Sequence, residues 1–272
     1  MDSLIFQAMA VELKHKIANS RLDRVVQTTA GTLVLRFWTG REKVHLLLKA
    51  DGQGAFYQTR LAHPAPASPP RFCQLLRARL RRLLDVRAEA NDRIVHFIFA
   101  GDDNERYDLI LEAFGTQGNL ILLDANGRII DLLWRIDGAR KLLPGESYHL
   151  PAQKERLSLF APRADVLSLL EAAADTRSLD RVELAPMSPA LAKAFSIERT
   201  EGTSFDAMLD RLLVSFQDGP FAALRVARDW LTGLLPLAPG VHGFADVVKS
   251  EDLSARLAAR LADKVPSSAA AL

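Results

Sequence analysis

The sequence predicts an α+β fold, in which an N-terminal domain with an antiparallel sheet precedes an all-helical domain. After a helical N-terminus, short apolar runs alternate with turn residues, a pattern typical of antiparallel strands. From about residue 163 onward the apolar residues recur at helical spacing instead. A stretch containing Pro and Gly separates the two parts, so we place the boundary near residue 150. We expect domains at 1–150 and 151–248, followed by a terminal helix and tail at 249–272.

The first helix is expected to run to about Asn19, because four apolar residues recur at four-residue intervals. These residues are Ile5, Met9, Leu13 and Ile17. Three short strands follow at 32–38, 43–49 and 55–57, each rich in β-branched or aromatic residues and separated by Gly-containing turns.

A second helix is predicted after the Pro-rich loop 63–70, with Ser68 as its N-cap. Apolar residues at 3/4 spacing extend past the middle of this segment, so we expect one continuous helix that buries a single face. They are Phe72, Leu75, Leu76, Leu80, Leu83 and Leu84. The same segment is the most basic in the chain, with Arg71, Arg77, Arg79, Arg81, Arg82 and Arg87.

The remaining elements complete the sheet and then form the helical domain. Four strands are predicted, at 93–99, 107–112, 119–123 and 128–134, and Asn126-Gly127 predicts a type I′ hairpin between the last two. Helices are predicted at about 163–175, 188–200, 203–217, 219–234 and 250–265.

The composition excludes several classes of catalytic site. A single cysteine, Cys73, excludes an internal disulfide and a cysteine-rich zinc site, and we interpret it as a buried structural thiol. The six histidines are too dispersed to form a recognised ligand pair, and no phosphate-binding loop or serine nucleophile motif is present. The acidic stretch 102–105 is interpreted as a solvated turn. We therefore expect a protein that is not an enzyme and needs no cofactor or metal.

Charge and hydropathy limit the partners. The net charge is only +2, so affinity for nucleic acid depends on local clusters of arginine. No apolar run approaches the roughly 18 residues of a membrane helix. The N-terminus lacks the features of a signal peptide. We expect a cytoplasmic protein that does not bind membranes, and the sequence leaves its oligomeric state open.

Seven segments, taken in order, resemble the NFACT-N domain. They are "MDSLIFQAMAVEL", "RLDRVVQ", "PPRFCQLLRARL", "NDRIV", "LEAFGTQGNLILLD", "LLPGESYHLP" and "MSPALAKAF". This domain is the N-terminal module of the RqcH, Rqc2 and NEMF ribosome quality-control factors, a family also called fibronectin-binding protein A. The resemblance covers about residues 1–250, and "RLDRVVQ" is similar to the turn that leads into the family's sheet.

The resemblance implies a fold similar to the N-terminal and helix-hairpin-helix parts of DNA glycosylases, and a role in translation. Such proteins bind tRNA and a large ribosomal subunit obstructed by peptidyl-tRNA, and they promote untemplated C-terminal tailing, with alanine in bacteria. The peptidyl transfer belongs to the ribosome, which agrees with the lack of a catalytic constellation here.

The resemblance also implies the RNA-binding residues. The family's Asp-Arg pair corresponds to Asp92 and Arg93, and its acidic motif corresponds to Glu112, Ala113 and Phe114. An arginine presents a planar fork to a phosphate or base edge, and an aromatic ring can stack on an unpaired base. Independently of the family, the basic segment predicts phosphate contacts from Arg71, Arg77, Arg81 and Arg82.

The chain departs from the family at several points. Gly115-Thr116 replaces a glycine followed by a basic residue, and Pro186-Met187 replaces a glycine expected before the Ser-Pro element. The family's coiled coil and C-terminal RNA-binding domain are missing, so we interpret the sequence as a fragment or a shortened homologue.

Three other functions compete with RNA binding. A glycosylase would need an N-terminal proline nucleophile, but position 2 is Asp2 and the first proline is Pro64. An adhesin would need an export signal. A non-catalytic interaction scaffold remains open, with the last helix docking a partner through Leu253, Leu257 and Leu261.

Overall fold

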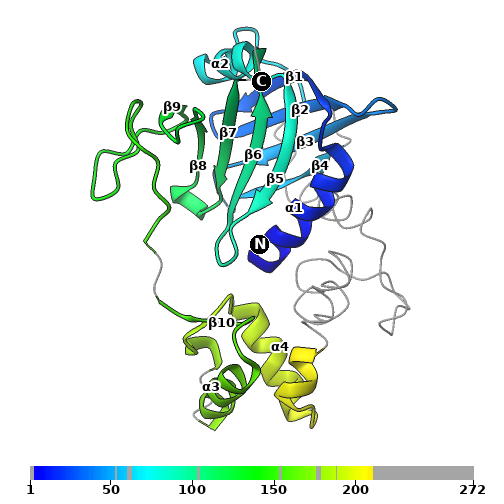
Figure 1. Cartoon of the computed structure of the whole chain (residues 1–272), viewed down its shortest axis with the longest axis vertical. Helices are drawn as coiled ribbons and strands as arrows, with labels where there is room; N and C mark the ends of the chain where they lie inside the picture. Colours follow the sequence, from blue (N-terminus) through cyan, green and yellow to red (C-terminus); the bar gives the residue numbers. More distant parts are fainter. Residues whose placement is uncertain are drawn as a thin grey trace, which may run out of the picture. The chain divides into compact units, whose positions relative to one another are not determined.

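The computed structural model describes residues 3–52, 54–59, 63–102, 105–152, 155–175, 179–187 and 189–210. Contacts divide the chain into two units, and the first runs from Ile5 to Ala152 (Figure 1). The helices expected at 219–234 and 250–265 lie outside the described residues. So do Leu253, Leu257 and Leu261, the residues of the second of these segments that were expected to dock a partner.

The first unit contains a nine-stranded sheet in the order β4-β3-β2-β1-β5-β6-β7-β8-β9, with every neighbouring pair antiparallel. The antiparallel N-terminal domain predicted from the sequence is therefore confirmed. Its strands are β1 (Arg21–Thr29), β2 (Thr32–Trp38), β3 (Lys43–Lys49), β4 (Ala55–Thr59), β5 (Arg82–Ala88), β6 (Ile94–Ala100), β7 (Arg106–Glu112), β8 (Asn119–Leu123) and β9 (Ile129–Leu132). Its helices are α1 (Ser3–Ile17), α2 (Arg71–Arg79) and the short 3₁₀ turn η2 (Gly115–Gln117).

Aromatic contacts show that the sheet curls around one apolar core. The ring of Phe37 on β2 stacks at 6.2 Å from Phe99 on β6, and Phe56 on β4 meets Phe97 on β6 at 6.0 Å. Neither pair of strands is adjacent in the sheet, so the inner faces of its two halves must face each other. Helix α1 joins this core through Phe6, whose ring lies 5.0 Å from that of Phe56.

The sheet has two distinct ends. The turn between β5 and β6 lies at the same end as the turn between β7 and β8, because Ile94 pairs with Glu112 and Glu112 pairs with Asn119. We call this the β5–β6 end. Helix α2 lies at the opposite end, the α2 end, as Figure 1 shows with α2 above the sheet and the β5–β6 turn below it. Strand β6 separates the ends by about 20 Å, at about 3.3 Å per residue.

The prediction of one continuous helix through Leu84 is wrong. Helix α2 ends at Arg79, Leu80 is extended with ψ 133°, and β5 begins at Arg82. The backbone here is held by sheet hydrogen bonds, from Arg81 N to Ala100 O at 2.9 Å and from Leu83 N to Ser20 O at 3.0 Å. The expected Ser68 cap is also wrong, because the N-cap residue is Pro70 and no side chain caps the helix.

Two further details differ from the sequence prediction. The segment resembling a turn into the sheet forms part of the nine-residue strand β1. The β8–β9 hairpin is not type I′, because Gly127 has a positive φ and Asn126 does not. The Gly127 N–H donates to Asp124 O at 3.1 Å, and Asp124 N donates to Arg128 O at 2.9 Å. This is a three-residue loop that ends in a left-handed glycine.

The second unit is described as far as residue 210. Helices α3 (Arg163–Asp175) and α4 (Pro189–Thr200) occupy two of the expected helical segments, and η3 (Leu179–Arg181) is a 3₁₀ turn between them. Strands β10 (Leu157–Ser158) and β11 (Leu184–Ala185) pair in parallel, so the described part is not entirely helical.

Candidate nucleic-acid interface

The Asp92-Arg93 pair lies in the β5–β6 turn. A hydrogen bond from Glu89 N to Ile94 O at 2.9 Å closes this turn, and Asp92 Oδ1 accepts the Arg93 N–H at 2.8 Å. The Arg93 carbonyl accepts from Ala113 N at 2.9 Å, which joins the turn to the end of β7. Among the described residues, none forms a hydrogen bond or ion pair with the Arg93 guanidinium. The backbone of Arg93 is fixed while its side chain remains available to a ligand.

Glu112 is held inside the fold. Its side chain is 1% exposed, and Arg140 donates to both carboxylate oxygens, with Nη1 at 2.9 Å from Oε2. The Tyr148 hydroxyl donates to Oε1 at 2.7 Å. Burial and the Glu112 charge raise the pKa of Tyr148. Burial tends to lower the pKa of Arg140, but the hydrogen bond and charge of Glu112 raise it overall. Glu112 therefore anchors the segment that follows β9.

The two residues after Glu112 are also packed. Ala113 is fully buried, and Phe114 is half-buried against a hydrophobic cluster. That cluster comprises Ile94, Ile110, Ile121, Leu123, Ile129, Leu132 and Leu142. The three residues of the acidic motif thus lie beside Arg93, but only Phe114 reaches the surface in part.

Two glycines bring neighbouring turns into backbone contact at the β5–β6 end. A Cβ added to Gly118 would lie 1.9 Å from Ala50 O, and one added to Gly54 would lie 2.7 Å from Ala113 Cα. The β3–β4 turn therefore packs directly on the β7–β8 turn. This close approach fixes the loop that carries Phe114.

The sequence did not single out Asn119, a buried amide at the same end. Its Nδ2 donates to Trp134 O at 2.7 Å, and its Oδ1 accepts from Trp134 N at 3.2 Å. It therefore fixes the backbone of Trp134, whose side chain is 36% exposed. The signal in the sequence was an Asn at the first position of an apolar strand, where it must find partners or be excluded from the core.

The predicted arginines lie at the α2 end. The Arg71 Nη2 atom donates to Asp131 Oδ1 at 2.7 Å, and the Asp131 side chain is 1% exposed. Asp131 Oδ2 is buried with no hydrogen-bond partner in the described part of the chain. Arg71 thus compensates a buried carboxylate on β9 and ties the start of α2 to the sheet.

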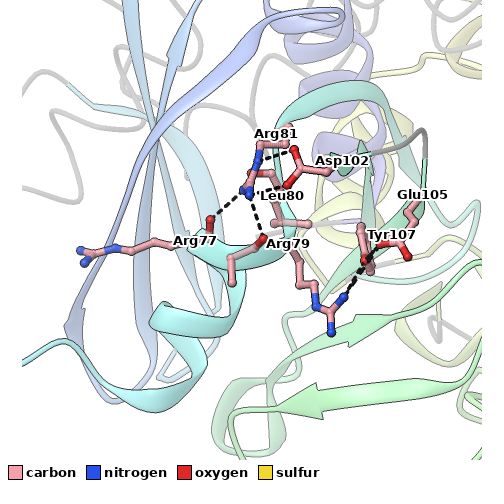
Figure 2. Close-up of polar contacts among 8 residues, drawn as sticks. Arg77, Arg79, Leu80, Arg81, Asp102, Glu105 and Tyr107 are labelled. Atoms are coloured by element: carbon pink, nitrogen blue, oxygen red, sulfur yellow. Dashed lines mark hydrogen bonds and ion pairs between the residues drawn. The ribbon is translucent and has the colours of Figure 1, made fainter.

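Two more of these arginines bond to the protein itself, and Figure 2 shows the contacts of Arg81. Arg77 donates from Nε and Nη2 to Val25 O, at 2.9 and 2.7 Å. Arg81 donates to the last carbonyl oxygens of α2, including Arg77 O at 2.8 Å, and forms a two-pronged ion pair with Asp102 at 2.9 and 2.7 Å. A cation at this position satisfies the free carbonyls of a helix C-terminus.

Arg82 differs from the other three. It lies on β5, is exposed, and forms no ion pair with any residue in the described ranges. The structure therefore brings together Asp92, Arg93, Glu112, Ala113 and Phe114 at one end of the sheet. It places Arg81 and Arg82 at the other end, about 20 Å away by the length of a seven-residue strand. Arg71 and Arg77 belong to helix α2, but their guanidinium groups bond to Asp131 on β9 and Val25 on β1.

Other site chemistry is limited in the described residues. No group of three or more His, Cys, Asp or Glu side chains there is arranged to hold a metal ion. Cys73 is buried, as predicted. Its Sγ lies 3.6 Å from Val25 O. Within the same ranges, no helix has the length and hydropathy needed to span a membrane.

A comparison with protein families shows which family the chain belongs to. The family model described as NFACT N-terminal and middle domains matches residues 2–211. The chain belongs to this NFACT family. This confirms the resemblance found in the sequence.

Named NFACT relatives are ribosome quality-control proteins. "Rqc2 homolog RqcH" of Streptococcus pneumoniae serotype 2 is 28% identical over 178 residues, covering 61% of this chain and 32% of the relative. The protein of that name from Bacillus subtilis is 28% identical over 209 residues, covering 71% and 36%. "Ribosome quality control complex subunit 2" of Saccharomyces cerevisiae is 33% identical over 136 residues, covering 48% and 12%. The chain thus spans about a third of the length of its bacterial relatives.

Solved structures of two bacterial proteins share the fold. The N-terminal domain of the fibronectin-binding protein PavA from Streptococcus pneumoniae gives a TM-score of 0.65 at 22% identity, covering 74% of this chain and 80% of that one. The fibrinogen-binding protein from Staphylococcus aureus gives 0.65 at 21% identity, covering 80% and 81%.

Proposed function

We propose that this chain is an RNA-binding part of a ribosome quality-control factor, which binds tRNA and the large subunit of stalled ribosomes. In this role it supports C-terminal alanine tailing and is not itself an enzyme, since the ribosome performs the peptidyl transfer. Because this role is performed on ribosomes, we propose that the protein acts in the cytoplasm.

The match of the NFACT model over residues 2–211 carries this proposal. Relatives from bacteria and yeast that share this region are named for ribosome quality control. The chain covers only 32% to 36% of its bacterial relatives, so tailing by the present chain needs its own demonstration.

Arg93 is the residue we propose as the central tRNA contact. Its carbonyl is fixed by Ala113 N, and its guanidinium has no partner among the described residues. Because the backbone is already fixed, binding a phosphate or a base edge has to order only the Arg93 side chain, whose planar fork suits either ligand. Asp92 supports the turn through the Arg93 N–H.

We propose that the acidic motif Glu112-Ala113-Phe114 acts by positioning other residues and not by binding RNA directly through its acid. Glu112 and Ala113 are buried, so neither offers a surface to RNA. Glu112 instead holds Arg140 and Tyr148, and Tyr148 packs against the same hydrophobic cluster as Phe114. Phe114 is half-buried and offers an edge for stacking at most. Among the α2-end arginines, Arg82 is the one best placed to meet phosphate directly, and Arg71, Arg77 and Arg81 contribute charge while bonded to the protein.

Sequencing of RNA that co-purifies with the chain tests the proposal. The chain should enrich tRNA over other small RNAs, and it should co-sediment with isolated large subunits carrying peptidyl-tRNA more than with vacant ones. Recovery of no RNA, or equal sedimentation with both kinds of subunit, contradicts the proposal.

A further inference from the structure

A single cross-strand row of residues crosses the sheet at the α2 end. The register pairs Lys43 with Trp38, Trp38 with Arg21, and Arg21 with Arg82. It continues from Arg82 to Ala100 and from Ala100 to Arg106. We call the four cations and Trp38 the arginine row, which consists of Lys43, Trp38, Arg21, Arg82 and Arg106.

All members of the arginine row point to the outer face of the sheet. Residues directly opposite each other on antiparallel strands project from the same face. Each member is exposed, and Trp38 is 43% exposed. Neighbouring residues along the strands, such as Phe37 and Phe99, are fully buried in the core on the inner face.

Arg21 and Arg82 are opposed at close range. The hydrogen bonds from Leu22 N to Arg81 O at 2.7 Å and from Leu83 N to Ser20 O at 3.0 Å flank the pair. This pattern marks a non-hydrogen-bonded pair, in which the Cα atoms approach to about 4.5 Å and the side chains are closest. Like charges opposed in this way destabilise a sheet.

The part of the protein that the structure describes does not neutralise these charges. Within the described ranges, none of the four cations forms an ion pair. The nearby acids have other partners: Asp23 binds Arg36 at 2.7 Å, and Asp102 binds Arg81. Glu105 accepts from the Tyr107 hydroxyl. Glu42, which precedes Lys43 in the sequence, is exposed in the turn before β3.

We propose that the arginine row binds the backbone of an unpaired segment of RNA, with Trp38 stacked on one of its bases. This inference deepens the proposed function and rests on it. Five steps at about 4.8 Å between strands give the row a path of about 24 Å around the curled sheet, enough for as many as about seven nucleotides stacked 3.4 Å apart. An aromatic side chain within a line of cations is the arrangement that binds single-stranded nucleic acid. An acidic peptide offers no base to stack on Trp38.

The first arm of the test compares two triple variants that each remove three positive charges. R21Q/R82Q/R106Q neutralises the row, and R128Q/R135Q/R181Q removes exposed arginines elsewhere. The probes are an end-labelled single-stranded RNA of about twelve nucleotides and deacylated tRNA, titrated by fluorescence anisotropy over a range of salt concentrations. The row variant should bind at least about tenfold more weakly, and its slope of log affinity against log salt should fall by about 2, since each lost contact removes about 0.7.

The control variant should keep its affinity within about threefold, because the summed charge falls equally but no contact is lost. An equal loss of RNA affinity in both triple variants contradicts the arginine row as the binding site, because it indicates a general effect of net charge. The single variant R82Q should lower the slope by about 0.7 and guards against misfolding of the triple variant.

The second arm uses intrinsic fluorescence, because the chain has only three tryptophans. The variant W134F/W230F retains Trp38, and RNA should quench its emission, whereas the same RNA with abasic positions should not. The matched variant W38F/W230F retains Trp134, at the other end of the sheet, and any quenching of Trp134 should be unchanged by R21Q/R82Q/R106Q, whereas the quenching of Trp38 should be lost. Quenching confined to Trp134 contradicts the base contact at Trp38.

The outcomes separate this inference from the proposed function. If the wild-type chain binds tRNA and the row variant binds it equally well, the row is not the RNA site, while the proposed function stands. If the wild-type chain binds neither RNA probe, the proposed function fails and the inference fails with it. Tighter binding of polyglutamate than of RNA, lost in the row variant, contradicts the choice of RNA as ligand.

Discussion

Arg140 donates hydrogen bonds to both carboxylate oxygens of Glu112, a side chain that is only 1% exposed. The pair joins the end of β7 to the segment after β9, and the Arg140 guanidinium also lies 5.2 Å from the ring centre of Tyr148. An acid expected to face RNA is thus an internal anchor. Removal of the Glu112 carboxylate would change the protein surface only by displacing the residues that it positions, Arg140 and Tyr148.

Replacement of Arg140 with methionine should destabilise the first unit. The change leaves Glu112 buried and without its cation, which typically costs about 3–5 kcal/mol. The loss should fall near the lower limit, because Tyr148 remains bonded to Oε1. Urea unfolding of R140M against the wild type measures it. R135M, at an exposed arginine nearby, is the control and should change the free energy of unfolding by less than about 0.5 kcal/mol.

Gly118→Ala should be among the most destabilising small substitutions. The added Cβ would lie 1.9 Å from Ala50 O and 2.8 Å from Glu112 O, both backbone atoms that cannot turn aside. Because overpacking of this kind costs about 1–3 kcal/mol or more, we expect a loss of about 3 kcal/mol by chemical denaturation. Gly138→Ala is the control, since nothing lies within 4 Å of its added Cβ. Equal stability of both variants would show that the two turns do not touch.

His96 should make stability depend on pH. Its Nδ1–H donates to Asp108 at 2.7 Å, and Glu89 lies 3.1 Å from Nε2. Burial and Arg87 tend to lower the pKa of His96, but Asp108 and Glu89 raise it overall above 6.5. A raised folded-state pKa stabilises the protein fully below pH 6.5, and this contribution is lost as pH rises through the folded-state value. Unfolding of wild type and H96Q from pH 5 to 8 should show a difference that shrinks as pH increases. A difference that grows with pH contradicts the ion pairs.

Arg82→Gln should stabilise the protein at low salt. The change removes the repulsion between Arg82 and Arg21, and opposed like charges cost about 0.2–1 kcal/mol. The gain in melting temperature should disappear at about 1 M salt, where the Debye length is about 3 Å. A loss of stability at low salt would mean that Arg82 has a favourable partner.

Much of the sheet was predictable because local signals agreed. The runs that became β2, β3 and β6 to β8 are apolar and bounded by turn residues, and their positions matched to within one or two residues. The segment that became β5 failed because Leu80, Leu83 and Val86 recur at the three-residue spacing of a helix face. A register shift between Leu83 and Asp85 interrupts the alternation that would have indicated a strand. Hydrogen bonds to Ser20 and Ala100, which are distant in sequence, make this segment a strand and not a helix.

The candidate site was predictable only in part for the same reason. Sequence order places Asp92-Arg93 close to the basic segment, but the β5–β6 hairpin carries the pair to the opposite end of the sheet. The arginine row could not be found from spacing, because Arg21 and Arg82 meet only through the non-local pairing of β1 with β5. Cross-strand neighbours of this kind depend on register.

The affinity of the Arg93→Ala variant for tRNA tests the central claim most directly. The Arg93 guanidinium has no partner among the described residues, so its removal should leave the melting temperature within about 2 °C. At the same time, tRNA binding measured by anisotropy should weaken by at least about tenfold, as expected when a charged contact is removed. Unchanged tRNA affinity, or a large fall in melting temperature, would contradict the claim that Arg93 faces RNA.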